Sequence, residues 1–342
     1  MGQKMKLKKI RDQVVVVTGA SSGIGRATAR LAAKQGAKVV LAARDEPSLR
    51  EATHDIERHG GTAHYVVADV SDPAQVENVA QVAQSSFGGL DTWVNNAGVT
   101  IFGRIQDVSY EDARRLFDVN YWGVVYGTLT ALRHMGRRSG AIINVGSIVS
   151  RRSLPLQGHY SASKHAVKGF TEALRVELEH DELPIALTMV DPGSIATGFV
   201  EHAKNYLPRR PTLPSPLYSP EIVARTIIEC AQRPVRRISV GATGPLVSAT
   251  SGTPALADHV LSRAAYMTQQ TDQPADDGES ALHHPMFGTG KEQADFGRRV
   301  RRSSLYTKAV LRPGRALVTA TAMGVGLLWA ATRIRSASWI GR

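Results

Sequence analysis

A run of four valines, a glycine-rich turn and a helical segment follow one another near the amino terminus. Residues 14–17 are all valine, and such a β-branched run bounded by polar residues and glycine predicts a buried strand. Residues 23–35 carry apolar positions at helical spacing, and Gly36 ends them. A strand, a tight turn and a helix in this order begin a β-α-β unit, in which the helix N-terminus faces the turn.

The same alternation continues through about two thirds of the chain. The predicted strands are apolar along their length, which indicates a parallel sheet covered by helices on both faces. We therefore expect an α/β fold, a doubly wound (Rossmann-like) parallel sheet, in one domain over residues 1–249. The further strands are expected at residues 39–43, 63–68, 92–95, 141–145, 185–190 and 238–240, and the further helices at residues 47–59, 72–86, 110–136, 160–180 and 221–233.

Three segments depart from this pattern. Residues 201–220 contain five prolines, which argue against regular structure. Residues 250–297 are polar and include four acidic residues between positions 272 and 279, so we expect a linker or extension there. Residues 298–342 form a basic tail in which residues 316–332, seventeen in number, carry no charge. We expect an apolar helix in this tail.

The excess of positive charge lies in the tail. Residues 298–342 hold ten Lys/Arg and no Asp/Glu, which leaves 32 basic against 30 acidic residues, a net of +2, for the other 297. A nearly neutral body has no basic face for phosphate neutralisation, so we expect no nucleic acid on it. The single cysteine, Cys230, suits a reducing compartment, and we expect a cytoplasmic protein in which Cys230 is a small core residue.

Three interpretations of the tail remain open. An uncharged stretch of this length is close to the lower limit for a membrane span, about 17–25 residues, and its basic flanks suit an anionic lipid surface. Residues 298–342 are therefore a candidate membrane contact. The same stretch could instead dock on the body or on a second subunit, or belong to a basic tail that binds nucleic acid.

The glycine-rich turn can hold the diphosphate of a dinucleotide. Backbone N–H groups and a helix N-terminus face an anion there. Gly19 permits the tight turn, while Gly23 and Gly25 let cofactor and backbone approach closely. The spacing is G-x3-G-x-G rather than the general G-x-G-x-x-G fingerprint, so the turn alone is also compatible with a plain loop.

The end of the second predicted strand indicates the type of dinucleotide. An acidic residue there would bond the ribose 2′-hydroxyl, whereas an arginine accommodates a 2′-phosphate. Ala43 stands at the acid position and Arg44 follows it, so we expect NADP(H) rather than NAD(H). The alternative is that Arg44 points to solvent and Asp45 caps the next helix.

A tyrosine, a lysine and a serine predict proton transfer. Tyr160 and Lys164 are four residues apart and hence lie on one helix face. A free tyrosine, with a pKa of about 10, is a poor base at neutral pH. The ammonium of Lys164 and an oxidised nicotinamide would both favour the phenolate and lower that pKa. Ser147, just beyond a predicted strand, can donate a hydrogen bond to a substrate oxygen.

These motifs, with Asn95, Asn96, Ala97 and Gly98, resemble the short-chain dehydrogenase/reductase family over about residues 10–245. The resemblance implies that the protein is an NADP(H)-dependent dehydrogenase/reductase that moves a hydride between the nicotinamide and a carbonyl or secondary alcohol. It also implies a homo-oligomer. The alternatives are an NAD-dependent alcohol dehydrogenase and a nucleotide-binding redox sensor or scaffold.

The resemblance assigns roles to particular residues. Tyr160 becomes the general acid/base, Ser147 the group that polarises the carbonyl, and Lys164 the modifier of the tyrosine pKa and a ribose ligand. Asn120 becomes the residue that holds a water of the proton relay. The implied cofactor-binding residues are Thr18, Gly19, Ser21, Ser22, Gly23, Ile24, Gly25, Arg44, Asp69, Val70, Asn96, Ala97, Gly98, Tyr160, Lys164, Pro192, Gly193 and Thr197.

The substrate and metal expectations rest on fewer residues. Apolar residues in the segment 147–158 favour a hydrophobic carbonyl or alcohol, although they could instead pack the loop itself. Residues 199–220 would form a lid over the site. His283 and His284 lack further ligands at metal-binding spacing, so we expect no metal.

Overall fold

A computed structural model describes residues 5–241, 253–275 and 279–311 of the chain. Its centre is a seven-stranded sheet in which all neighbouring strands are parallel, in the order β11-β7-β6-β4-β1-β2-β3. The order runs outward in both directions from β1, as in a doubly wound fold. The strands are β1 (Val14–Thr18), β2 (Lys38–Ala43), β3 (Thr62–Val67), β4 (Thr92–Asn95), β6 (Gly140–Val145), β7 (Ile185–Pro192) and β11 (Arg237–Val240).

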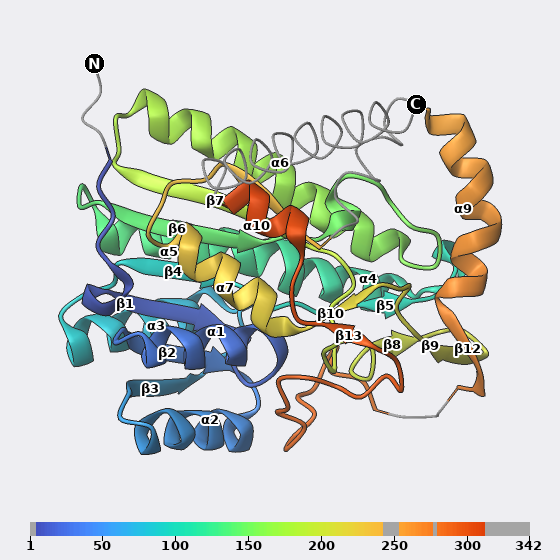
Figure 1. Ribbon diagram of the computed structural model, residues 1–342, viewed down its shortest axis with the longest axis horizontal. Coiled ribbons are helices and arrows are strands. Elements are labelled where there is room, and N and C mark those ends of the chain that lie inside the picture. Colours follow the sequence, from blue (N-terminus) through green and yellow to red (C-terminus); the bar gives the residue numbers. More distant parts are fainter. Residues whose placement is uncertain (1–4, 242–252, 276–278, 312–342) are drawn as a thin grey trace, which may run out of the picture.

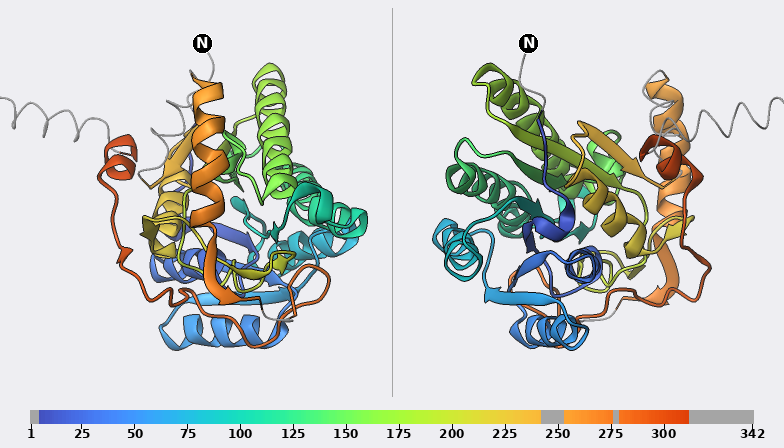
Figure 2. Two further views of the ribbon diagram at one scale, coloured as in Figure 1. Left: turned by 90° about the vertical axis from the view of Figure 1, so that its right-hand side faces the viewer. Right: turned by 60° about the vertical axis from the view of Figure 1, so that its left-hand side comes forward.

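Helices cover both faces of this sheet (Figures 1 and 2). One layer packs α1 (Gly23–Lys34) against α2 (Glu46–Arg58) and α7 (Pro220–Cys230). The other layer comprises α3 (Pro73–Phe87), α4 (Tyr110–Phe117), α5 (Gly123–Met135) and α6 (Gly158–His180). The expected α/β doubly wound architecture is thereby confirmed.

The two main apolar clusters of the core lie one on each side of the sheet. Side chains alternate along a strand, so Val15 and Val17 of β1 enter one cluster while Val14 and Val16 enter the other. All four valines are buried, which is why the strand reads as a continuous apolar run. Cys230 is fully buried in the first cluster, as expected of a small core residue.

The helical stretch expected at residues 110–136 is not one regular helix. A π-helical turn at Asp118–Trp122 separates α4 from α5. Such turns insert a residue into the helical ladder, often at functional sites. The turn contains Asn120, whose side chain bonds other segments, and nothing in the local apolar spacing signals it.

The proline-rich residues 201–220 differ from the expectation of no regular structure. Three short strands lie there: β8 (Lys204–Asn205), β9 (Arg209–Pro211) and β10 (Leu217–Tyr218). Each pairs with a distant segment, namely β5 (Ile101–Phe102), β12 (Gln270–Pro274) and β13 (Val300–Arg301). Prolines exclude long strands, but two- or three-residue pairings need few backbone donors.

The segment expected as a polar linker is largely built into the structure. Helix α9 (Pro254–Thr268) stands at one end of the molecule, on the right of Figure 1 and in front in the left view of Figure 2. Strand β12 follows it, and residues 281–294 then run along the body. The first part of the basic tail also joins the body, since α10 (Leu305–Leu311) contacts α7 and β11.

Within residues 5–241, 253–275 and 279–311, no helix has the length and apolar character to cross a bilayer. The apolar stretch at 316–332 and the three interpretations of it lie outside the described residues. In that described part of the chain, no three His, Cys, Asp or Glu side chains gather as a metal site would require.

Candidate active site

A cavity of about 710 Å³ opens at the carboxyl ends of the parallel strands. This is the edge where a doubly wound sheet binds its ligand, at the point where the strand order reverses between β1 and β4. Three predicted site residues, Thr18, Gly25 and Asn120, are not among the residues that line the cavity. The predicted residues that do line it are Gly19, Ser21, Ser22, Gly23, Ile24, Arg44, Asp69, Val70, Asn96, Ala97, Gly98, Ser147, Tyr160, Lys164, Pro192, Gly193 and Thr197.

The glycine-rich turn is held from behind by the loop after β4. The Thr18 hydroxyl accepts hydrogen bonds from the backbone N–H of Asn96 and Ala97, at 3.0 and 3.2 Å. The Asn96 amide in turn donates to the carbonyls of Thr18 and Gly19, at 3.0 and 3.2 Å. Thr18 therefore shapes the turn without reaching the cavity.

Two glycines of the turn are required by geometry. Gly19 has a φ of +65°, in the left-handed region that glycine adopts without strain. A Cβ at Gly25 would lie 2.1 Å from the Gly19 carbonyl oxygen, so helix and turn could not pack as they do. Gly25 is therefore a packing residue behind the cavity wall.

Arg44 lies at the carboxyl end of β2 and does not point into solvent. Its side chain is 20% exposed and lies 3.8 Å from the Asp69 carboxylate. Its guanidinium donates to the backbone carbonyls of Ala281, Leu282 and His283. Asp45 caps α2 by accepting from the Ser48 N–H at 3.2 Å. The expectation that Asp45 caps the next helix is thus confirmed, and the alternative that Arg44 points to solvent is wrong.

Asp69 is held in place by several donors. Its carboxylate pairs with Arg115, and it accepts from the backbone and the hydroxyl of Ser71 at 3.0 and 2.8 Å. Asp69 and Arg44 follow β3 and β2, which are neighbours in the sheet, so the fold places a carboxylate and a guanidinium beside each other in the cavity wall.

The tyrosine, lysine and serine converge on the other half of the cavity. Tyr160 and Lys164 belong to the first two turns of α6, and Ser147 follows β6. The Lys164 ammonium donates to the Val145 carbonyl at 3.0 Å and lies 5.9 Å from the centre of the Tyr160 ring. The Tyr160 ring also packs against Phe199, with ring centres 5.6 Å apart.

Burial controls the ionisation of this group. It raises the pKa of Tyr160 to about 12, against the opposing effect of a hydrogen bond with Ser147. It lowers the pKa of Lys164 to about 8, against the opposing charge of Asp191. The shift is opposite to the expected lowering, because desolvation of the phenolate outweighs the hydrogen bond with Ser147. The part of the expectation that depends on an oxidised nicotinamide stays a prediction. At neutral pH Tyr160 is a protonated phenol.

Asn120 lies behind the cavity wall and does not line the cavity. Its side-chain oxygen accepts from the Val99 N–H at 2.8 Å, and its amide donates to the Val99 carbonyl at 2.9 Å and to the Ser163 hydroxyl at 3.1 Å. The side chain is fully buried. It joins the segment after Gly98 to α6, and its expected role as a water ligand stays a prediction.

Helix α9 supplies part of the cavity wall that sequence reasoning missed. The Gln269 amide donates to the Pro155 carbonyl at 2.9 Å, and the Gln157 amide donates to the Gln269 side chain at 2.8 Å. These bonds fix the end of α9 to the loop that precedes Tyr160. The helical spacing of the apolar residues in α9 could have predicted this helix, although residues 250–297 are polar on average. The lining residues from α9 are Leu256, Ala257, Val260 and Leu261.

Residues 281–294 line the opposite end of the cavity and were also missed. They have no regular secondary structure, and their positions depend on contacts with distant segments, as far as 262 residues earlier in the chain. His283 is only partly exposed and pairs with Asp112 at 2.7 Å. The lining residues from this segment are Ala281, Pro285, Met286 and Thr289.

Comparison with known proteins agrees with this architecture. The family described as short chain dehydrogenase matches residues 13–206. An uncharacterized oxidoreductase of Bacillus subtilis, YxnA, is 42% identical over 335 residues, which are 96% of this chain and 93% of that protein. Its similarity therefore includes most of the segment after residue 250.

Two solved structures share the fold. A short-chain dehydrogenase/reductase from Burkholderia phymatum, in complex with NAD, has a TM-score of 0.66 and 29% identity over 79% of this chain and 100% of its own. An alcohol dehydrogenase from Thermococcus sibiricus, complexed with 5-hydroxy-NADP, has a TM-score of 0.59 and 27% identity over 67% of this chain and 95% of its own. The fold, the cavity and these similarities together show that the chain belongs to the short-chain dehydrogenase/reductase family.

Proposed function

We propose that this protein is an NADP(H)-dependent oxidoreductase that transfers a hydride between the nicotinamide and the carbonyl or secondary alcohol of a hydrophobic compound. One observation carries the proposal. Ser147, which follows β6, and Tyr160 and Lys164 of α6 line the same cavity as the glycine-rich turn, which lies more than 120 residues earlier in the chain.

The residues present fit a dinucleotide. The cavity runs from the turn at Gly19 and Ser22, where a helix N-terminus suits a diphosphate, to Tyr160 and Ser147. Pro192 and Gly193, at the end of β7, line it beside the latter pair. When bound, the nicotinamide supplies or accepts the hydride.

Tyr160 provides the proton in the reductive direction. Because its pKa is raised to about 12, the hydroxyl is protonated at neutral pH and can donate to an oxygen that gains negative charge. The Ser147 hydroxyl can donate a second hydrogen bond to that oxygen. The Lys164 ammonium, largely charged below pH 8, stabilises the phenolate that remains.

The choice of NADP(H) is supported by the end of β2. Ala43 offers no carboxylate to a ribose 2′-hydroxyl, and the Arg44 guanidinium lines the cavity at that place. Arg115, which pairs with Asp69, adds a second positive charge nearby. A 2′-phosphate there would meet the Arg44 guanidinium, in a wall that also contains Asp45 and Asp69.

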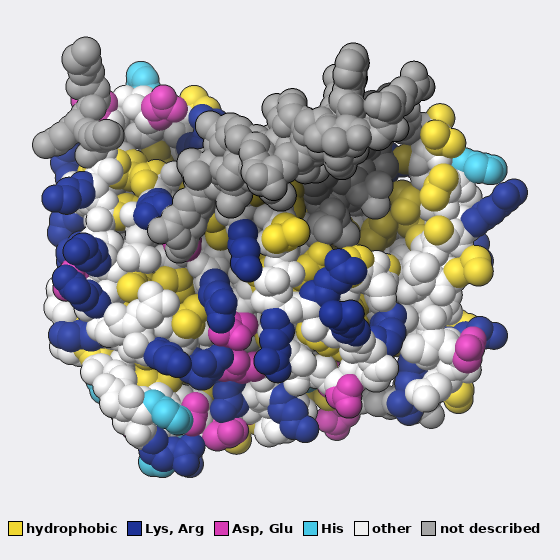
Figure 3. Space-filling view, in the orientation of Figure 1, with side chains coloured by type: hydrophobic (Ala, Val, Ile, Leu, Met, Phe, Trp, Pro, Cys, Tyr) yellow, Lys and Arg dark blue, Asp and Glu magenta, His cyan; other side chains and the backbone are white. Residues whose placement is uncertain are grey.

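A hydrophobic substrate is supported by the other end of the cavity. The walls there come from the loop after β6, from the segment after Thr197 and from α9. Apolar side chains gather over α9 at the upper right of Figure 3. Two of the α9 residues that line the cavity, Leu256 and Val260, are more than half exposed. The apolar residues in these walls are Ile148, Val149, Leu154, Phe199, Leu213, Pro214, Leu256, Ala257, Val260 and Leu261.

The catalytic part of the proposal is tested with Tyr160→Phe. We expect turnover of NADPH with a panel of hydrophobic aldehydes and ketones to be lost. The Kd for NADPH, measured by fluorescence titration, should be unchanged. Tyr65→Phe is the matched control, because its hydroxyl bonds Glu46 at 3.3 Å and does not line the cavity. Retained turnover in Tyr160→Phe would end the assignment.

The cofactor part is tested with Arg44→Asp. The ratio of kcat/KM for NADPH to that for NADH should fall by at least about tenfold, since the new carboxylate repels a 2′-phosphate and can bond a 2′-hydroxyl. Arg50→Asp, on the exposed side of α2, is the control. An unchanged ratio would show that Arg44 does not read the 2′ position.

A further inference from the structure

Residues 281–294 cross the nucleotide end of the cavity as an irregular segment of turns and bends, here called the strap (orange, lower centre of Figure 1). The strap follows α9 and β12 in the chain and lies on the parts of the sheet nearest the amino terminus. It lies outside residues 13–206, which match the family. Its contacts show what it does to the nucleotide site.

The first half of the strap is fixed at the ends of β2 and β3. Leu282 is fully buried, in the same core cluster as Val66 and Val70. The Leu282 carbonyl accepts from Arg115 at 3.1 Å and from Arg44 at 3.4 Å, and the His283 carbonyl accepts from Arg44 at 3.1 Å. The strap thereby determines the direction in which the Arg44 guanidinium points.

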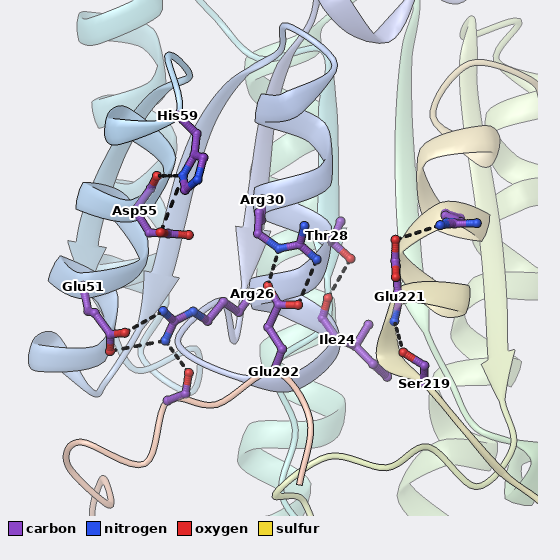
Figure 4. Close-up of polar contacts among 12 residues, drawn as sticks. Ile24, Arg26, Thr28, Arg30, Glu51, Asp55, His59, Ser219, Glu221 and Glu292 are labelled. Carbon is purple, nitrogen blue, oxygen red and sulfur yellow. Dashed lines mark hydrogen bonds and ion pairs between the residues drawn. The ribbon is translucent and has the colours of Figure 1, made fainter. Parts of the chain in front are cut away.

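The second half of the strap lies against the glycine-rich turn and α1 (Figure 4). The Lys291 carbonyl accepts from the Gly23 N–H at 3.1 Å. The Gly290 carbonyl accepts from Arg26. The Glu292 carboxylate takes two hydrogen bonds from Arg30, at 2.6 and 3.0 Å. Two-point pairing of this kind fixes direction as well as distance.

No free space separates the strap from the body at Gly290. A Cβ there would lie 2.5 Å from the Ser48 Cβ and 2.8 Å from the Ser21 carbonyl oxygen. Ser21 lines the cavity, so the strap touches the cavity wall itself. A larger residue at position 290 would have to lift the strap.

Both ends of the strap are joined to the segment after β7. The Ala281 N–H donates to the His202 carbonyl at 2.9 Å, and the Ala294 N–H donates to the Ala196 carbonyl at 3.2 Å. The strap therefore spans from that segment to α1, β2 and β3 and back. Between its two ends, Pro285, Met286 and Thr289 line the cavity.

We propose that the strap is a wall of the nucleotide site, which covers the adenosine half, orients Arg44 and must open before a bound dinucleotide can leave. The role of the strap rests on one part of the proposed function, namely that a dinucleotide binds in the cavity. It does not depend on catalysis. We thereby assign a binding role to a segment outside the part of the chain that the family shares.

The test measures dinucleotide dissociation rather than turnover. Full-length protein loaded with NADPH or with NADH is chased in a stopped-flow fluorimeter, and dissociation rates are compared for wild type, Glu292→Gln and Gly290→Val. We expect each variant to release the dinucleotide at least about tenfold faster, equal to about 1.4 kcal/mol. Glu292→Gln is the mild change, so a folding defect in Gly290→Val does not remove the test.

Glu77→Gln is the matched control. Glu77 also pairs with Arg133 and His134 across two helices, at 2.7 and 2.6 Å, and its side chain is 31% exposed against 25% for Glu292. It does not line the cavity. Its dissociation rates should stay within about twofold of wild type, a difference below 0.5 kcal/mol.

Hydrogen exchange of the full chain supplies a second readout. Saturating dinucleotide should slow deuterium uptake in residues 281–294 of the wild type, and Glu292→Gln should reduce that protection. Unchanged dissociation rates in both strap variants, or no protection of the strap, would overturn the proposal. If the wild type binds dinucleotide without turnover, the proposed function falls and the strap remains testable. If it binds neither dinucleotide, both proposals fall.

Discussion

Replacing either of two helical glycines, Gly169 or Gly25, by alanine should change the free energy of unfolding, with opposite sign at the two positions. Alanine in a helix interior is favoured over glycine by about 1 kcal/mol, chiefly because the unfolded chain loses less freedom. Gly169 lies in the middle of α6, and a Cβ there would meet nothing within 4 Å. We expect Gly169→Ala to raise the free energy of unfolding by about 0.5–1 kcal/mol and Tm by about 2 °C.

Gly25 lies in the first turn of α1, where an added side chain has no room. A Cβ would lie 2.1 Å from the Gly19 carbonyl oxygen and 2.6 Å from the Asn96 amide nitrogen. The Gly19 carbonyl would have to move by about 1 Å, although Asn96 holds it, and such overpacking costs about 1–3 kcal/mol. The gain from helix propensity is smaller, so Gly25→Ala should destabilise the protein and distort the dinucleotide site.

Urea unfolding and NADPH titration of the two variants measure both effects. Gly25→Ala should lose stability and weaken NADPH binding by at least about tenfold, whereas Gly169→Ala should bind NADPH as the wild type does. If Gly25→Ala is as stable as the wild type and binds NADPH equally well, the close approach of α1 to the turn is not what requires glycine. A loss of stability in Gly169→Ala would show that another surface covers that position.

Three further predictions concern the catalytic group, the core and α9. Because burial lowers the pKa of Lys164 to about 8, its ammonium is present below pH 8, and kcat/KM for carbonyl reduction should fall as pH rises above it. A flat profile from neutral to alkaline pH would contradict this. Ile142→Ala in β6, fully buried, should cost about 2–5 kcal/mol by urea unfolding, and a loss below 1 kcal/mol would show that the core closes over the gap. Leu256→Asp should raise KM for long linear ketones several-fold more than for short ones, and equal changes for both would place the substrate chain elsewhere.

The elements closest to chemistry were predictable because their signals are local. The valine run and the glycines of residues 19–25 specify a strand, a turn and a helix start within a dozen residues. Tyr160 and Lys164 share a helix face because of a fixed four-residue spacing. The π-helical turn around Asn120 was not predictable, because its residues bond Val99 and Ser163 rather than one another.

The pKa of Tyr160 likewise depends on tertiary packing and not on local sequence. Lys164, four residues after Tyr160 in the chain, suggests a lowered pKa for the phenol, yet burial raises that pKa and outweighs the hydrogen bond with Ser147. Arg44 gives a similar contrast. Its place after β2 follows from the local pattern, whereas its partners come from a segment about 240 residues later.

The pattern of residues along the chain thus specified the layers of the fold and the chemical groups at the strand ends, since strand and helix periodicity and turn chemistry act over a few neighbours. Tertiary packing specified which side chains share a cavity, how far each is removed from water, and that residues 254–268 and 281–294 close over it. Those outcomes arise from contacts between distant segments. Residues 281–294 have no helix or strand periodicity from which their position could be predicted. Desolvation and close packing act only once the chain has folded.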